Sequence, residues 1–126
     1  MSNSPRHAGT GINLFATEDL SGTARWFEDT SDVLDIDEDD LPDTIAFVHK
    51  GGMAFLSPIL PDLRAIVCTA GSRESHLAIL SRESAVPCVL AADIFTDLPD
   101  GARVTLGLRD AQRATIDIVT APAATA

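Results

Sequence analysis

The three histidines are the side chains of this sequence best suited to chemistry at neutral pH, because an imidazole exchanges its proton close to about pH 7. His7 lies among small polar residues and is expected to face solvent, and His49 is expected to be an ordinary polar residue at a strand end. His76 stands at the expected start of a helix, after a short apolar run and a turn that contains glycine. The free N–H groups of a helix N-terminus keep an imidazole neutral and can bind an anion such as phosphate. His76 is therefore a candidate nucleophile, and a purely structural histidine is the alternative.

An acidic block at residues 28–43 is the second feature with possible chemistry. It holds nine of the nineteen acidic residues and no basic one, so the rest of the chain carries only −1 of the net charge of −10. Asp35, Asp37 and Asp39 have the alternate spacing of a calcium-binding loop, but Asp40 and Ala46 occupy the positions where such a loop needs glycine and glutamate. We therefore interpret the block as a solvated acidic loop, and the alternatives are a weak cation site or a docking surface for a basic partner.

Charge and hydropathy exclude other classes of function. The scattered arginines and the acidic balance exclude a nucleic-acid binder, and no apolar run approaches the ~20 residues of a membrane span. Because the N-terminus lacks an apolar signal core, a cytoplasmic location is expected. Cys68 and Cys88 have no metal-binding spacing and are expected to be buried free thiols, so no metal site is predicted.

The elements that must position His76 follow from the apolar pattern. The 126 residues are 45% hydrophobic, which predicts one compact domain at 22–119 between a loose N-terminal segment at 1–21 and a flexible tail at 120–126. The runs 22–27, 44–49, 65–68 and 87–90 are typical of strands, and the alternating segments 102–106 and 113–119 predict a β-hairpin. A helix is predicted over 76–84, with Ser75 as its N-cap and Pro87 beyond its end. Strands with a few interposed helices predict an α/β domain.

Residues 66–90, IVCTAGSRESHLAILSRESAVPCVL, resemble the phosphohistidine motif in the mobile, swivelling domain of the phosphoenolpyruvate-utilising enzyme family. That family has a pattern like T-x-x-G-G-x-T-S-H-x-A-I-x-A-R-x-x-x-I-P-A-V-V-G. The matching positions, all at the right spacing, are Gly71, Ser75, His76, Ala78, Ile79, Arg82, Pro87 and Val89. The resemblance extends over residues 22–119, including a stretch LPDGARV at 98–104 that is similar to the family's L-x-D-G-x-x-V hairpin.

The resemblance implies a fold and a function. The fold would be the family's β/β/α swivelling phosphohistidine domain. His76 would accept a phosphate and pass it on, and the side chains or backbone expected to bind that phosphate are those of Gly71, Ser72, Arg73, Ser75 and Arg82. For Arg82 a surface ion pair is the alternative.

A lone phosphohistidine domain cannot turn over by itself, so the resemblance implies a phosphocarrier subunit of a split phosphotransferase. Its partners would be an ATP-grasp or phosphoenolpyruvate-binding subunit and a subunit with the acceptor site. The chain itself would bind no cofactor, and ATP or phosphoenolpyruvate with Mg²⁺ would belong to the partner. The sequence does not name the donor or the acceptor.

Four departures from the family pattern matter for the predicted chemistry. Ser72 replaces the second glycine of the turn and Glu74 replaces a threonine, while Cys68 and Ala91 replace the leading threonine and the closing glycine. Serine restricts a backbone position that can need a positive φ, and a carboxylate beside a bound phosphate is electrostatically unfavourable. Two hypotheses follow: an active phosphocarrier, or a catalytically degenerate domain that acts as an assembly or regulatory subunit.

Overall fold

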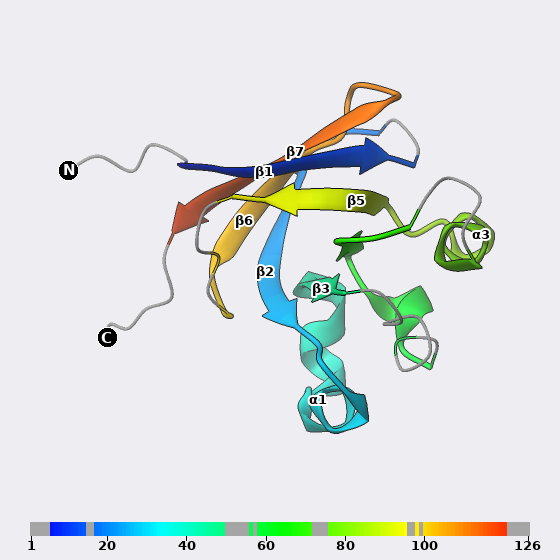
Figure 1. Cartoon of the computed structure of the whole chain (residues 1–126). Coiled ribbons are helices and arrows are strands. Elements are labelled where there is room, and N and C mark those ends of the chain that lie inside the picture. The colour runs from blue at the N-terminus through cyan, green and yellow to red at the C-terminus, as the bar shows by residue number, and fades with distance from the viewer. Residues whose placement is uncertain are drawn as a thin grey trace.

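The computed structural model describes residues 6–14, 17–49, 56, 58–71, 76–95, 98 and 100–120 (Figure 1). The strands are β1 (Arg6–Asn13), β2 (Leu20–Trp26), β3 (Thr44–Val48), β4 (Ala65–Cys68), β5 (Cys88–Ile94), β6 (Arg103–Gly107) and β7 (Arg113–Thr120). The α-helices are α1 (Thr30–Asp35) and α3 (His76–Ser84), and the 3₁₀ helices are η1 (Glu38–Asp43) and η2 (Leu60–Asp62).

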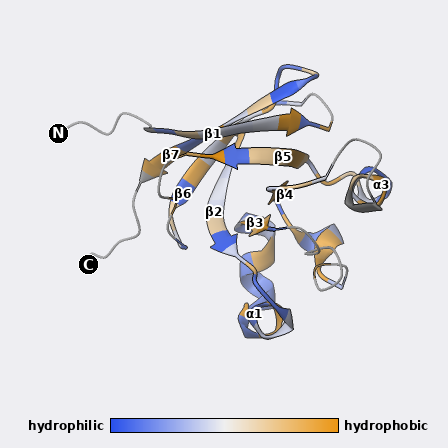
Figure 2. Cartoon of the chain, in the orientation of Figure 1, coloured by the Kyte–Doolittle hydropathy of each residue, from blue (hydrophilic) through white to orange (hydrophobic). Residues whose placement is uncertain are grey.

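The seven described strands close into one barrel in the order β1-β5-β4-β3-β2-β6-β7. The pairs β2–β3, β3–β4 and β4–β5 are parallel, and the remaining neighbours are antiparallel. Every residue of β3 and β4 is buried, as expected for short apolar strands inside a parallel arrangement. Figure 2 shows β3 in the hydrophobic colour. The predicted strands and the predicted hairpin of β6 and β7 are therefore confirmed.

Alternate residues of these strands pack into two separate cores. Ile45 and Phe47 of β3 belong to a cluster to which all seven strands contribute, and this cluster fills the barrel. Ala46 and Val48 belong to a second cluster, which also holds Val33, Leu41, Leu60 and Ala78 from the helices. Since successive side chains of a strand point to opposite faces, the second cluster lies outside the barrel wall and attaches the helices to β3, β4 and β5.

The expected fold class, α/β with the β/β/α layers of a swivelling phosphohistidine domain, is wrong. The strands form one closed barrel, and the longest helix described, α3, has nine residues. The reason is β1, which pairs with both β5 and β7 and so removes the free edges that separate sheets would keep. The segment 1–21, expected to be loose, thus contributes a complete strand to the barrel, and the folded part begins before residue 22.

The glycines of β1 explain why it does not look like a strand in the sequence. A Cβ atom at Gly9 would lie 2.6 Å from the backbone oxygen of Asp93, and one at Gly11 would lie 2.9 Å from that of Leu90. Both contacts are with β5, so β1 can approach its neighbour this closely only because these residues have no side chain. Glycines, which in a sequence are typical of a loop, here allow β1 to pack closely against β5.

The acidic block, expected to be a loop, contains α1 and η1. Asp29 caps α1 by accepting hydrogen bonds from the backbone N–H groups of Ser31 and Asp32, and Asp32 completes the capping box. Val33 and Leu41 are buried, so apolar contacts fix the block against the outer core. The carboxylates around them are largely exposed, which agrees with the solvated part of the prediction.

Two further findings complete the fold. Cys68 and Cys88 are buried free thiols, as predicted. Within the described residues, no helix combines the length and the apolar character that a membrane crossing requires.

Candidate functional site

The residues that resemble the phosphohistidine motif form a strand–turn–helix unit. β4 ends at Cys68, the chain passes through Thr69, Ala70 and Gly71, and α3 begins at His76, where the helix was predicted to start. Gly71 has a φ of 97°, a conformation that side-chain-bearing residues rarely adopt. The glycine of the motif is thus required by the backbone of the turn.

Only part of the predicted phosphate site can be placed. Gly71 is exposed, and Arg82 is exposed on α3 and makes no ion pair with any other described residue. Ser72, Arg73 and Ser75, and with them Glu74, lie outside the described residues, as does the side chain of His76. The roles of these residues in binding phosphate therefore remain predictions.

The body of α3 is attached to the outer core by one face. Ala78 and Ser81 are buried and Leu80 packs against the same cluster, whereas Ile79 is exposed. The helix contacts η2 and β5 and lies outside the barrel (Figure 1). This spacing of buried residues fixes the direction of α3 and hence the place of its first residue, His76.

The C-terminal end of α3 is fixed by a left-handed residue. Ala85 has a φ of 58°, its N–H donates to the carbonyl of Arg82 at 3.2 Å, and the N–H of Val86 donates to that of Ser81 at 3.0 Å. These two bonds are the pair that defines a Schellman motif. Alanine thus occupies a position where glycine is usual.

The last position of the phosphohistidine motif also has a left-handed backbone conformation. Ala91, which stands where the family has its closing glycine, has a φ of 49°. Its N–H donates to the carbonyl of Ala70 at 3.0 Å. The backbone of β5 therefore supports the turn that leads to His76, in a conformation that explains why the family pattern has glycine there.

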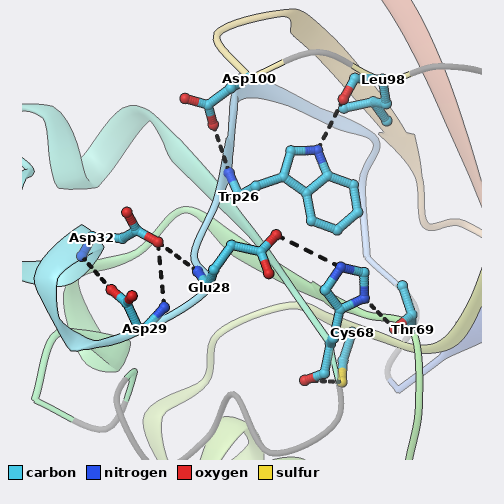
Figure 3. A network of polar contacts seen from close by, with 9 residues as sticks. Trp26, Glu28, Asp29, Asp32, Cys68, Thr69, Leu98 and Asp100 are labelled. Carbon is cyan, nitrogen blue, oxygen red and sulfur yellow. Dashed lines mark hydrogen bonds and ion pairs between the residues drawn. The ribbon is translucent and has the colours of Figure 1, made fainter.

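A cluster around His49 is the part of this region that sequence reasoning did not find. Figure 3 labels its other members, Trp26, Glu28 and Thr69. His49 Nδ1 lies 3.1 Å from Thr69 Oγ1, and His49 Nε2 lies 3.8 Å from a carboxylate oxygen of Glu28. The ring stacks on Trp26, with centroids 5.0 Å apart and planes at 23°. We name Trp26, Glu28, His49 and Thr69 the His49 cluster.

The parallel strand pairing explains how these residues meet. Trp26 ends β2, His49 follows β3 and Thr69 follows β4, so all three stand at the carboxyl ends of neighbouring parallel strands. That edge is where α/β sheets commonly place functional groups. The signal that could have found the cluster is the parallel order of β2, β3 and β4.

The buried thiols are not candidates for a nucleophile. Burial raises the pKa of the Cys68 thiol and raises that of Cys88 to about 12, and the reactive form of cysteine is the thiolate. Among the described residues no group of three histidine, cysteine, aspartate or glutamate side chains could hold a metal ion. The imidazoles therefore remain the groups of interest in this region.

The sequence matches a known protein family. Residues 42–119, more than half of the chain, match the family described as "PEP-utilising enzyme, mobile domain". The match includes the strand–turn–helix unit and His76. Among curated proteins, none is similar enough to this chain to count as a match.

Solved structures share the fold at low sequence identity. An MccF-like protein from Bacillus anthracis strain Ames is 15% identical with a TM-score of 0.58, covering 86% of this chain and 42% of its own. A muramoyltetrapeptide carboxypeptidase from Oxalobacter formigenes is 13% identical with a TM-score of 0.54, covering 92% of this chain and 51% of its own. This chain thus spans about half the length of either protein or less. The likeness concerns the fold alone, and it agrees with the correction of the fold class made above.

Proposed function

Because this chain belongs to the family of PEP-utilising enzyme mobile domains, we propose that it is a phosphocarrier whose His76 accepts a phosphoryl group from one partner subunit and passes it to another. The observation that carries the proposal is the position of His76 as the first residue of α3, the helix that follows the buried strand β4 along the chain. A helix start favours a neutral imidazole and offers N–H groups to an anion. Both properties suit a histidine that is alternately free and phosphorylated.

The proposed reaction consists of two displacements at phosphorus. In the first, the lone pair of a neutral imidazole nitrogen attacks the phosphorus of the donor, an N–P bond forms and the P–O bond to the leaving group breaks. In the second, an acceptor oxygen attacks, the N–P bond breaks and its electron pair returns to the imidazole. Catalysis of such steps is mainly positioning and electrostatic stabilisation. The chain would contribute the helix start, and Arg82 would contribute positive charge.

Both steps require other proteins. We propose that ATP or phosphoenolpyruvate, with Mg²⁺, is bound by a donor subunit of the ATP-grasp or phosphoenolpyruvate-binding type, and that the acceptor site lies on a further subunit. The support is chemical: a single carrier histidine has no leaving group to activate until a donor is presented to it. The chain would then be a phosphotransferase subunit that is inactive without its partners.

Two sequence departures favour a second candidate function. Ser72 and Glu74 replace the glycine and threonine of the family motif, and Glu74 adds a negative charge two residues before the histidine that would carry the phosphate. If this repulsion abolishes phosphorylation, the chain is an assembly or regulatory subunit that does not carry phosphate. Glu74→Thr separates the two functions, because it restores the motif without changing His76.

The test is covalent labelling of the chain by a donor subunit with radiolabelled ATP or phosphoenolpyruvate. The carrier proposal predicts one phosphate, labile in acid and stable in base as phosphoramidates are. His76→Ala should abolish the label, whereas neither His49→Ala nor His7→Ala, the matched control, should abolish it. If Glu74 repels phosphate, Glu74→Thr should raise the labelled fraction. Absence of label from both the wild type and Glu74→Thr would favour the assembly role.

A further inference from the structure

We propose that His49 is a positioning residue for His76, acting through Thr69 at the start of the turn that joins β4 to α3. The inference rests on the proposed function, because it concerns how the same site is held. It assigns a role to a side chain that lies outside the phosphohistidine motif and that comes from a different strand.

The contact between His49 and Thr69 is direct. His49 Nδ1 and Thr69 Oγ1 are 3.1 Å apart, within hydrogen-bonding distance. The backbone of Thr69 is held as well, because its N–H donates to the carbonyl of Val48 at 3.0 Å. Thr69 is therefore held by a backbone bond and a side-chain bond, both to the end of β3.

Thr69 is the first residue of the turn, so its orientation sets the direction in which the chain leaves the barrel. The next residue, Ala70, accepts the hydrogen bond from Ala91 of β5. Gly71 then takes its left-handed conformation. The entrance of the turn is thus held from both sides, by His49 after the end of β3 and by Ala91 of β5.

The His49 ring is itself oriented by its surroundings, of which Figure 3 labels Trp26 and Glu28. One face stacks on Trp26, whose indole N–H donates to the carbonyl of Leu98 at 2.9 Å. The carboxylate of Glu28 lies 3.8 Å from Nε2, and the backbone N–H of Glu28 donates to Asp32 of the α1 capping box at 2.6 Å. These contacts direct Nδ1 towards Thr69.

Because the side chains of His49 and Glu28 are largely exposed, a positioning role for His49 can be distinguished from a role in stabilising the fold. The side chains of His49 and Glu28 are 55% and 62% exposed, and contacts between exposed side chains contribute little to stability. Loss of the His49–Thr69 bond should consequently leave the fold nearly unchanged. Its effect should appear where the turn must be correctly placed, which is in the reactivity of His76.

The experiment measures phosphorylation of His76 by potassium phosphoramidate, which phosphorylates histidine without an enzyme and so needs no donor subunit. His49→Phe keeps an aromatic ring for Trp26 and removes the hydrogen bond, and Thr69→Val keeps the shape of threonine and removes the hydroxyl. Each should lower the initial rate at His76 roughly three- to tenfold. His49→Asn and Thr69→Ser, which keep a polar atom near the same place, should restore most of the rate.

The double variant identifies the route of the effect. If His49 acts through Thr69, then His49→Phe combined with Thr69→Val should be no slower than either single variant. Multiplying effects, or a wild-type rate in His49→Phe, would overturn the positioning role. Thermal unfolding should show that each variant is folded, and His7→Ala is the control for a histidine outside the cluster.

The proposed function and this inference fail in different ways. A wild type that is not phosphorylated at His76 overturns both, because there is then no reaction to position. Normal phosphorylation of the wild type with unaltered rates in the His49 and Thr69 variants overturns the positioning role alone. Peptide mapping under alkaline conditions must assign the phosphate, since the exposed ring of His49 can also react with this reagent.

Discussion

Glycine at positions 85 and 91 should stabilise this protein, which is the reverse of the usual effect of replacing alanine by glycine in a folded chain. Both alanines have a left-handed backbone, with φ values of 58° and 49°. Ala85 ends α3 and Ala91 supports the turn of the phosphohistidine motif. The pair therefore tests whether the two ends of the segment that holds His76 are built as described.

The expected increase in the free energy of unfolding is the difference between two opposing contributions. A non-glycine residue in the left-handed region costs roughly 1–2 kcal/mol, and glycine costs roughly 0.5–1 kcal/mol more backbone entropy on folding. Both alanines are exposed, so removal of the methyl group leaves no cavity. Each change should raise the free energy of unfolding by about 0.5–1 kcal/mol, or raise Tm by roughly 2–6 °C.

Thermal and urea unfolding of Ala85→Gly, Ala91→Gly and the double variant measure this gain. Ala111→Gly is the matched control, because Ala111 is exposed and is not among the residues with a positive φ. It should be neutral or destabilising by up to about 1 kcal/mol. If Ala85→Gly and Ala91→Gly behave like Ala111→Gly, the left-handed conformations are not present in the protein and the account of the turn is refuted.

Three further predictions concern the barrel, the thiols and one ion pair. Gly9→Ala should lower the free energy of unfolding by about 1–3 kcal/mol, because its Cβ would meet the β5 backbone at 2.6 Å; a loose N-terminal segment would tolerate it in urea unfolding. Cys88, whose pKa is raised to about 12 by burial, should react with a thiol reagent at about pH 8 only after denaturation, and rapid reaction of the native protein would contradict this. Partial burial raises the pKa of Asp43, but hydrogen bonds led by the Arg103 guanidinium outweigh it and the pKa lies below its ordinary value. The carboxylate therefore stabilises the fold above its ordinary pKa and ceases to do so as the pH falls through the lowered one. Asp43→Asn should lower the free energy of unfolding by less than about 1 kcal/mol at neutral pH, and this cost should shrink as the pH falls below the ordinary pKa of the carboxyl; a cost independent of pH would count against the ion pair.

Local patterns were sufficient to predict the segment that contains His76. The continuous apolar run of β4 and the start of α3 at His76 are set by residues close in the sequence, as is the hairpin of β6 and β7. The φ of Gly71 agrees with the glycine of the motif. These features depend on turn chemistry and on burial, which a sequence displays directly.

Contacts between distant segments were not predictable in this way. The closure of the barrel depends on β1, whose Gly9 and Gly11 are typical of a loop until β5 is known to lie beside them. The bond between His49 and Thr69 depends on the parallel order of β3 and β4, and nothing in either segment alone indicates the other. Both failures arise from pairings that only the whole topology determines.

The central claim is that His76 carries the phosphoryl group, and the most direct measurement is the position of the phosphate on the intact chain. After incubation with a donor subunit and its ATP or phosphoenolpyruvate, the protein should be digested and sequenced by mass spectrometry under alkaline conditions, where a phosphorylated histidine survives. The account predicts one phosphate per chain, on the first residue of α3, and none after brief exposure to acid. A phosphate on His7, on His49 or on a hydroxyl, with His76 unmodified, would contradict it.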